Sequence, residues 1–256
     1  MARKTEKPVA FIGAGPGDVE LITVKGKRLL SEADTIVYAG SLVNKGLLRF
    51  RKKGARLFDS SKMELGEITS VIVEAIKNGK RVARLVSGDA SLYSAVCEHI
   101  EELKKHGVES FMVPGVNSAL AGASSLGIEL TVPDITQTVI FTRLEGRTPS
   151  PENLSALAMH KATMCIFLSA HMIEELVAKL TKGYLPTTAV AVVHRATWKD
   201  EKIIKGTLAD IAEKVKKAKI LRQAVIIVGN ALDPRKTHGK RSLLYDKGFK
   251  HGFRKK

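Results

Sequence analysis

The sequence contains few cysteines, and their placement limits the kinds of protein it can encode. Only two of the 256 residues are cysteines, and Cys97 and Cys165 have neither C-x-x-C spacing nor the pattern of a disulfide framework. Both lie in apolar patterns, so we expect two buried free thiols in a protein of the reducing cytoplasm. The seven histidines show no metal-ligand spacing, so we expect no metal held by protein side chains.

Long apolar runs and aromatic residues are also scarce. No apolar run approaches the roughly 20 residues that a membrane-spanning helix needs, and the apolar stretch at residues 9–12 is too short for a signal peptide. Aromatic residues make up 5 % of the chain, and no RNP-like aromatic strand is present. We therefore expect a soluble protein with neither a membrane nor a nucleic acid as its partner.

Acidic residues are outnumbered by basic ones, 26 to 42, which gives a net charge of +16. This excess favours an anionic partner: nucleic acid, an anionic membrane surface or a polyanionic small molecule. Half of the net charge lies in residues 234–256, which also contain Tyr245, Phe249, His251 and Phe253. These aromatic side chains favour a tail docked on the fold over a solvated one.

Two hydrophobic periodicities alternate along the chain. Short apolar runs such as residues 35–40 are followed by helical spacing, as at residues 68–76, and this alternation favours a mostly parallel sheet covered on both faces. In the second half apolar strands are more frequent, and one clear helix is capped by Thr207, which predicts a mixed sheet. We expect two α/β lobes, residues 1–134 and 135–256.

The stretch "VAFIGAGPGDVELITVKG" near the amino terminus begins like a dinucleotide-binding motif and then departs from it. Its glycines are spaced G-x-G-x-G and are Gly13, Gly15 and Gly17. Asp18 stands where the third fingerprint glycine would fall, and Pro16 removes an N–H donor from the turn. A nicotinamide-dependent oxidoreductase is therefore disfavoured. A tight strand-to-helix connection and a site for a different ligand both stay open.

Two further turns of small residues follow predicted strands, at residues 87–89 and 114–118. Open α/β sheets bind ligands at the carboxyl ends of their strands. Three such turns predict a cleft lined by backbone. This lining suits an adenosine that carries a sulfonium, because carbonyls and a carboxylate stabilise the cationic half and apolar contacts hold the adenine.

The same turns carry a family resemblance. "IGAGPGDVELITVKG", "SGD" and "VPGVNS" are similar to three signatures of the tetrapyrrole methyltransferases that use S-adenosylmethionine. "TVPDITQTVIFTRLEGRTPSPE", "RATWKDEKI" and "LYDKGFKHGFRK" resemble segments of the precorrin-4 and cobalt-precorrin-4 C11-methyltransferases of cobalamin biosynthesis. The resemblance runs from about Pro8 to the end of the chain. It implies two α/β lobes with the cofactor in the cleft between them, a trough for a macrocycle with many carboxylates, and a homodimer.

The resemblance also implies site residues, position by position. Contacts to S-adenosylmethionine are expected from Pro16, Ser87, Gly88, Asp89, Leu92, Asn117, Ser118, Leu168 and Ala196. Relatives commonly have proline, threonine and methionine at Ala90, Asn117 and Leu168, so we expect an altered cofactor affinity. For the substrate carboxylates we expect Arg143 and Arg147, together with Ser41 and Arg195. The alternative for the first two is a surface loop braced by pairing with Glu145.

Methyl transfer from a sulfonium is an in-line displacement that needs no covalent enzyme intermediate. The absence of a convincing nucleophile–base set agrees with this, and the sequence identifies no catalytic residue or proton acceptor. Two alternatives stay open: methylation of another precorrin carbon by the same fold, and an RNA methyltransferase or RNA-binding protein whose basic tail binds the nucleic acid.

Overall fold

The computed structural model describes residues 7–250 and 252, and the chain forms two compact units. Unit 1 is Met1–Gly122 together with Arg195–Glu201, and unit 2 is Ala123–His194 together with Lys202–Lys256. The chain therefore leaves unit 1 before the boundary near residue 134 that the sequence suggests. Residues 195–201, expected in the second lobe, belong to unit 1.

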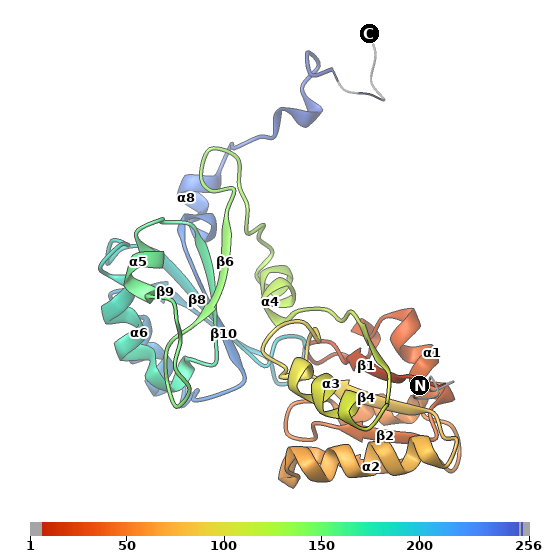
Figure 1. The fold of residues 1–256 in the computed structure, drawn as a ribbon. Helices are drawn as coiled ribbons and strands as arrows, with labels where there is room; N and C mark the ends of the chain where they lie inside the picture. The colour runs from red at the N-terminus through yellow and green to blue at the C-terminus, as the bar shows by residue number, and fades with distance from the viewer. Residues whose placement is uncertain (1–6, 251, 253–256) are drawn as a thin grey trace. The chain divides into compact units, whose positions relative to one another are not determined.

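Unit 1 is built on a parallel sheet with the strand order β3-β2-β4-β1-β5 (Figure 1). Its strands are β1 (Val9–Gly13), β2 (Thr35–Tyr38), β3 (Arg56–Asp59), β4 (Val82–Val86) and β5 (Ser110–Val113). Its helices are α1 (Val24–Glu32), α2 (Leu65–Lys77), α3 (Val96–Lys105) and α4 (Ser118–Leu126), the last of which continues into unit 2. Three short 3₁₀ segments, Val19–Leu21, Lys45–Phe50 and Ser60–Lys62, complete it.

Both faces of this sheet are covered by helices. On one face Ile12, Ile36 and Leu85 pack against Leu30 of α1, and on the other Phe11 packs with the apolar sides of α2 and α3. Burial on both faces explains why the strands read as continuous apolar runs. The mostly parallel sheet expected for the first lobe is confirmed.

Unit 2 is built on a mixed sheet with the order β6-β7-β10-β8-β9, in which only the β6–β7 pair is parallel. Its strands are β6 (Val139–Arg143), β7 (Thr163–Phe167), β8 (Ala189–His194), β9 (Lys202–Thr207) and β10 (Ala224–Val228). Its helices are α5 (Leu154–Ala158), α6 (Ile173–Leu180), α7 (Ile211–Lys217) and α8 (Pro234–Thr237), with 3₁₀ segments Ala170–Met172, Asn230–Leu232 and Leu243–Tyr245. The mixed sheet expected for the second lobe is confirmed.

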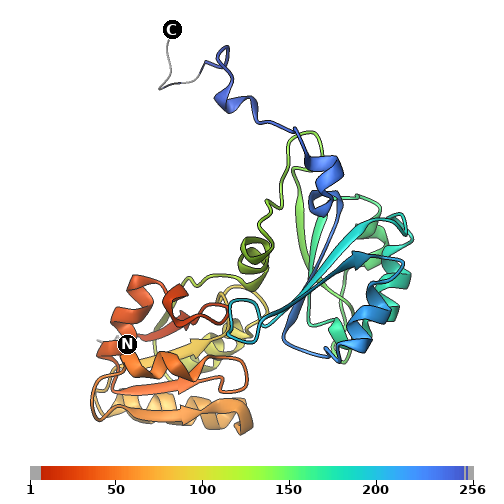
Figure 2. The same cartoon turned by 180° about the vertical axis from the view of Figure 1, so that it is seen from behind.

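The helices of unit 2 cover one face of its sheet (Figure 2). Ile166 and Ile226 face Leu176 of α6 and Ile211 of α7 in this core. Because side chains alternate along a strand, the intervening residues of β6 and β7 point to the opposite face. Phe141 lies on this opposite face, away from α6 and α7.

Several local expectations need correction. Cys97 is a free thiol but is exposed, because Val96 and Leu103 take the buried side of α3; Cys165 is buried as expected. The helix expected after Thr207 begins only at Ile211, and Asp210 accepts a hydrogen bond from the Thr207 amide. Among the described residues, every helix is too short or too polar to cross a bilayer.

The start of the basic tail is tied to unit 2 by ion pairs. Asp233 caps α8 and pairs with Arg235, and Lys240 pairs with Asp134. Beyond these contacts the chain runs away from the sheet of unit 2, and 71 % of Leu243 is exposed (Figures 1 and 2). The docking expected for the whole tail is therefore not observed for residues 241–250. His251 and Phe253 lie outside the described residues.

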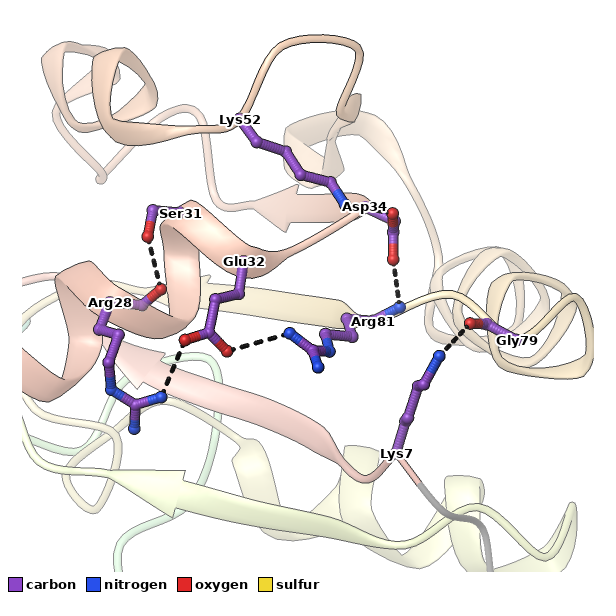
Figure 3. Close-up of polar contacts among 8 residues, drawn as sticks. All are labelled: Lys7, Arg28, Ser31, Glu32, Asp34, Lys52, Gly79 and Arg81. Atoms are coloured by element: carbon purple, nitrogen blue, oxygen red, sulfur yellow. Dashed lines mark hydrogen bonds and ion pairs between the residues drawn. The ribbon is translucent and has the colours of Figure 1, made fainter.

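A polar network ties the amino ends of the unit 1 strands together (Figure 3). Asp34 accepts hydrogen bonds from Lys52 Nζ and from the Arg81 amide, while Glu32 pairs with Arg28 and with Arg81. The Asp34 carbonyl also accepts from the Arg56 amide at the start of β3. The hydrogen bond from Lys52, followed by that from the Arg81 amide, lowers the pKa of Asp34. Asp34 thus links β2, β3 and β4 through its carboxylate and its backbone carbonyl.

We expect Asp34→Ala to lower the free energy of unfolding by about 1–2 kcal/mol at pH 7, because the Arg81 amide loses its charged acceptor. The folded-state pKa of Asp34 is depressed, so its contribution is complete above the unfolded value of about 3.8 and disappears as the pH falls through the folded value. Urea titrations of both proteins from pH 7 to pH 3 should therefore converge.

The matched control is Glu74→Ala, which removes an exposed pair with Arg56 at 3.7 Å. We expect it to cost less than about 0.5 kcal/mol at any pH. A difference between wild type and Asp34→Ala that stays constant across the titration would contradict the assignment.

Candidate functional site

Three turns meet at the carboxyl edge of the unit 1 sheet, because β1 lies between β4 and β5. The first turn follows β1 at residues 14–18, the second follows β4 at 87–91 and the third follows β5 at 114–118. Gly15 and Gly88 exchange backbone hydrogen bonds of 3.1 and 2.9 Å, so the first two turns pair as a short antiparallel bridge.

Asp89 joins the second turn to the third. Its Oδ2 accepts a hydrogen bond of 2.8 Å from the Gly115 amide, and its Oδ1 accepts from the amide and hydroxyl of Ser91. Desolvation opposes ionisation of this carboxyl, but the hydrogen bonds from Ser91 and Gly115 outweigh it and lower its pKa. Asp89 is therefore a carboxylate at neutral pH, and its first role is to hold two turns in register.

The glycines of these turns are required by contact between backbones. A Cβ on Gly13 would lie 2.6 Å from the Gly115 Cα, and a Cβ on Gly115 would overlap the Gly88 carbonyl oxygen. Gly88 itself has a φ of +64°, and a Cβ there would meet only the Val116 carbonyl oxygen at 3.9 Å. The turns are thus packed against one another, while the side of Gly88 that would carry a Cβ is open.

The third turn leads into α4. The Asn117 side chain accepts a hydrogen bond of 2.8 Å from the Ala119 amide and so caps the helix that begins at Ser118. The amide that replaces the family's hydroxyl at this position therefore has a local structural partner. In the second turn Ser87 and Leu92 are half-buried, and the Leu92 amide donates to the Asp89 carbonyl.

The segment of residues 195–201 packs on the first turn. Trp198 Nε1 donates a hydrogen bond of 2.8 Å to the Pro16 carbonyl, and the Asp18 amide donates to Thr197 Oγ1 at 2.9 Å. A Cβ on Gly17 would lie 2.6 Å from the indole nitrogen and 2.8 Å from the Ala196 carbonyl oxygen. Gly17 therefore makes room for the indole and the buried Ala196.

Arg195 is engaged within its own segment. Its guanidinium lies 4.2 Å from the centroid of the Trp198 ring and pairs with Asp200 at 2.6 Å. The residue has a φ of +51°, and its side chain is partly buried. These contacts give Arg195 a structural role beside the substrate contact expected from the sequence.

The remaining expected residues follow strands of either unit. Ser41 is exposed shortly after β2 in unit 1. In unit 2 the Arg143 side chain donates to the Thr148 and Pro149 carbonyls and thereby folds the loop that carries exposed Arg147. Leu168, just after β7, has a φ of +55° and a side chain that is 62 % exposed. A strained and exposed leucine is an outlier of the kind that gathers at functional sites.

The charge of the three turns is opposite to that of the chain. They contain two aspartates, Asp18 and Asp89, and no lysine, arginine or histidine, although the protein carries a net charge of +16. An acidic edge built from backbone groups fits a cationic ligand and does not fit a pyrophosphate. Within the part of the chain that the structure describes, no cluster of three or more His, Cys, Asp or Glu residues is placed to hold a metal ion.

Comparison with known proteins agrees with this geometry. A model of the tetrapyrrole (corrin/porphyrin) methylases matches residues 8–212. The chain belongs to this family. A cobalt-precorrin-4 C(11)-methyltransferase from Methanocaldococcus jannaschii is 52 % identical over 97 % of this chain and 96 % of its own.

Two solved structures of methyltransferases are similar to the whole fold. The X-ray structure of a cobalt-precorrin-4 methyltransferase of cobalamin biosynthesis has a TM-score of 0.87 and 43 % identity, over 91 % of this chain and 99 % of that one. A uroporphyrin-III C-methyltransferase from Thermus thermophilus, complexed with S-adenyl homocysteine, has a TM-score of 0.74 and 26 % identity, over 88 % and 93 % of the two chains.

In this tetrapyrrole methylase, unit 1 brings together most of the expected cofactor residues. Those from the three turns and from the 195–201 segment are Pro16, Ser87, Gly88, Asp89, Leu92, Asn117, Ser118 and Ala196. The sequence analysis did not single out Trp198 or Asn44, whose Nδ2 donates to the Gly17 carbonyl at 2.8 Å. One signal was available, since Trp198 is the only tryptophan in the chain.

We expect Gly115→Ala to destabilise the protein by about 3 kcal/mol or more, because its methyl group would overlap the Gly88 carbonyl oxygen. Gly66→Ala is the matched control, since a Cβ at this position of α2 meets nothing within 4 Å. We expect this change to stabilise the protein by about 0.5 kcal/mol. Equal melting temperatures for the two variants, measured by circular dichroism, would contradict the packing described for the turns.

Proposed function

We propose that this protein transfers the methyl group of S-adenosylmethionine to C11 of cobalt-precorrin-4, or of precorrin-4, in cobalamin biosynthesis. The observation that carries the proposal is the 52 % identity to an enzyme of that name, which extends over 97 % of the chain. Identity of that extent includes both units and the three turns, so it supports a shared reaction as well as a shared fold.

S-adenosylmethionine fits the carboxyl edge of unit 1. The ligand is cationic at its sulfur, and the three turns offer two aspartates and no basic side chain. The ionised Asp89 and the open side of Gly88 both lie on the second turn. The related methyltransferase structure with S-adenyl homocysteine supports the same class of ligand. We therefore assign this cofactor to residues 16, 87–92, 117–118 and 196 of unit 1. Leu168 of unit 2 is a further candidate, on the family resemblance alone.

Methyl transfer from a sulfonium needs little acid–base catalysis. The carbon–sulfur bond of the sulfonium breaks as the macrocycle carbon forms a bond to the methyl group, S-adenosylhomocysteine leaves, and the product gives up a proton. The protein supplies position, which for well-oriented reactants is worth about 7–11 kcal/mol of the barrier. The hydrogen bonds among the turns provide a rigid edge for this purpose.

The face of the unit 2 sheet that carries Phe141 offers aromatic contacts to a flat macrocycle. Phe141 and Phe167 lie on adjacent strands with centroids 5.9 Å apart in an edge-to-face arrangement, and Phe141 is 39 % exposed. Arg143 pairs in register with Phe167 and therefore lies on the same face. Aromatic rings beside a guanidinium suit a macrocycle that carries carboxylates. Arg147 is a further candidate for those carboxylates, together with Ser41 and Arg195.

The basic excess of the chain also agrees with a polyanionic substrate, since a positive surface draws anions to the protein. A homodimer and a place in the reducing cytoplasm are the remaining parts of this proposal. Light scattering of the purified protein tests the dimer.

The deciding experiment incubates the purified protein with S-adenosylmethionine and enzymatically prepared precorrin-4, with and without cobalt. We expect mass spectrometry to detect one added methyl group and carbon-labelled NMR to place it at C11. The faster of the two forms identifies the natural substrate. Cofactor binding without transfer to either form would move the activity to another tetrapyrrole carbon or to RNA, and no cofactor binding would refute the proposal.

We expect Phe141→Ala to raise the KM for the macrocycle about tenfold, which corresponds to ~1.4 kcal/mol of lost contact, and to leave the affinity for S-adenosylmethionine unchanged. Leu185→Ala is the control, because this leucine is also an exposed apolar residue and lies in a loop of unit 2 that the proposal does not use. Steady-state kinetics with each substrate varied in turn separate the two affinities. A higher KM in both variants, or in neither, would argue against a macrocycle on this face.

A further inference from the structure

The first turn is held on several sides by groups outside it. Trp198 Nε1 donates to the Pro16 carbonyl, Asn44 Nδ2 donates to the Gly17 carbonyl, and Thr197 Oγ1 accepts from the Asp18 amide, at 2.8, 2.8 and 2.9 Å. Gly15 is bonded to Gly88 through both its amide and its carbonyl. Four consecutive residues of the turn therefore have fixed backbone partners.

The indole is itself fixed by its own segment. Arg195 stacks on the Trp198 ring and pairs with Asp200, and the Thr197 amide donates to Glu201 Oε2. Two residues of this segment adopt left-handed backbone conformations, Arg195 at φ +51° and Thr197 at φ +65°. For a β-branched residue such as threonine this conformation is costly and persists only where surrounding contacts hold it. The strained backbone of this segment lowers its local stability, and this conformation places the indole against the first turn.

Gly17 and Trp198 fit each other. Any side chain at position 17 would collide with the indole, as the 2.6 Å distance from a Cβ to Nε1 indicates. Gly17, one of the glycines that suggest a nucleotide-binding loop, thus leaves room for the ring of Trp198. This tryptophan is 182 residues from Pro16 in the sequence.

We propose that Trp198 is a positioning residue for S-adenosylmethionine, acting through the first turn. This inference rests on the proposed function. The indole clamps Pro16 and Gly17 in the conformation that receives the cofactor, so the turn does not have to be ordered when the ligand binds. Rigid presentation of this kind improves affinity by removing the entropic cost of ordering a loop. Of the residues proposed for the macrocycle, Arg195 contacts the indole, whereas Phe141, Arg143 and Arg147 belong to unit 2.

The test uses four variants of the full chain: Trp198→Phe, Trp198→Ala, Gly17→Ala and the double variant Gly17→Ala/Trp198→Ala. Calorimetry with S-adenosylhomocysteine measures affinity, and kinetics measure the KM for each substrate. We expect Trp198→Ala and Gly17→Ala each to weaken S-adenosylhomocysteine binding about tenfold. The KM for the macrocycle should change less than the KM for S-adenosylmethionine, because the clamp reaches the macrocycle candidates only through Arg195. Trp198→Phe keeps a ring but loses the hydrogen bond to Pro16. Its affinity for S-adenosylhomocysteine should therefore lie between that of the wild type and that of Trp198→Ala.

The double variant distinguishes a clamp from two unrelated defects. Removing the indole relieves the clash of a methyl group at position 17 with the ring but leaves its 2.8 Å approach to the Ala196 carbonyl oxygen. The loss of affinity in the double variant should therefore be smaller than the sum of the two single losses. Because Trp198 is the only tryptophan, its fluorescence reports on this contact alone. In Gly17→Ala we expect red-shifted emission and stronger quenching by acrylamide than in the wild type.

Tyr184→Phe is the control for a merely structural effect, since it removes a buried hydrogen bond to the Ala162 carbonyl in unit 2. It should lower the melting temperature and leave the affinity for S-adenosylhomocysteine unchanged. If the wild type binds the ligand and the clamp variants bind it equally well, or if the two single effects add in the double variant, the role of Trp198 is refuted and the proposed function stands. If the wild type does not bind the ligand, both are refuted.

Discussion

Direct contact between backbones at the carboxyl edge of the unit 1 sheet is the constraint on which the rest of the site depends. The order β4-β1-β5 brings three turns so close that side chains at Gly13 and Gly115 cannot be accommodated. Hydrogen bonds between Gly15 and Gly88, and from Gly115 to Asp89, then use the polar groups that this proximity places together. The result is an edge whose shape is set by main chain, which cannot change rotamer and loses little entropy when a ligand binds.

Charge is separated within the molecule in a way that suits two unlike ligands. The three turns hold aspartates and no basic side chain, whereas the chain as a whole carries +16. A cationic cofactor and a polycarboxylate substrate need opposite local fields, and a single uniform surface could not serve both. On the unit 2 sheet, Arg143 and the exposed Phe141 lie on the same face, where the proposed function places the second ligand.

Most of the architecture could be predicted from local patterns. Strands and helices differ in hydrophobic periodicity, and this difference can be recognised within about ten residues. The two sheet types and the three turns of small residues that follow strands were predicted on this basis. The errors are local as well: Cys97 lies one position away from the buried side of α3, and the helix after Thr207 begins only at Ile211. The tail was expected to dock because of its aromatic content, but aromatic content does not identify a surface to dock on, and Leu243 is exposed.

The sequence by itself determined that the first turn is not a phosphate loop, since a proline has no N–H to donate and Asp18 repels an anion. It also determined the family, through short strings whose residue types are required at those positions. Only the tertiary structure decided why Gly17 is a glycine and what Arg195 contacts. Both answers involve the 195–201 segment, which packs on a turn 182 residues away from Trp198. Such a contact joins residues that are far apart in the sequence, so no local pattern can record it.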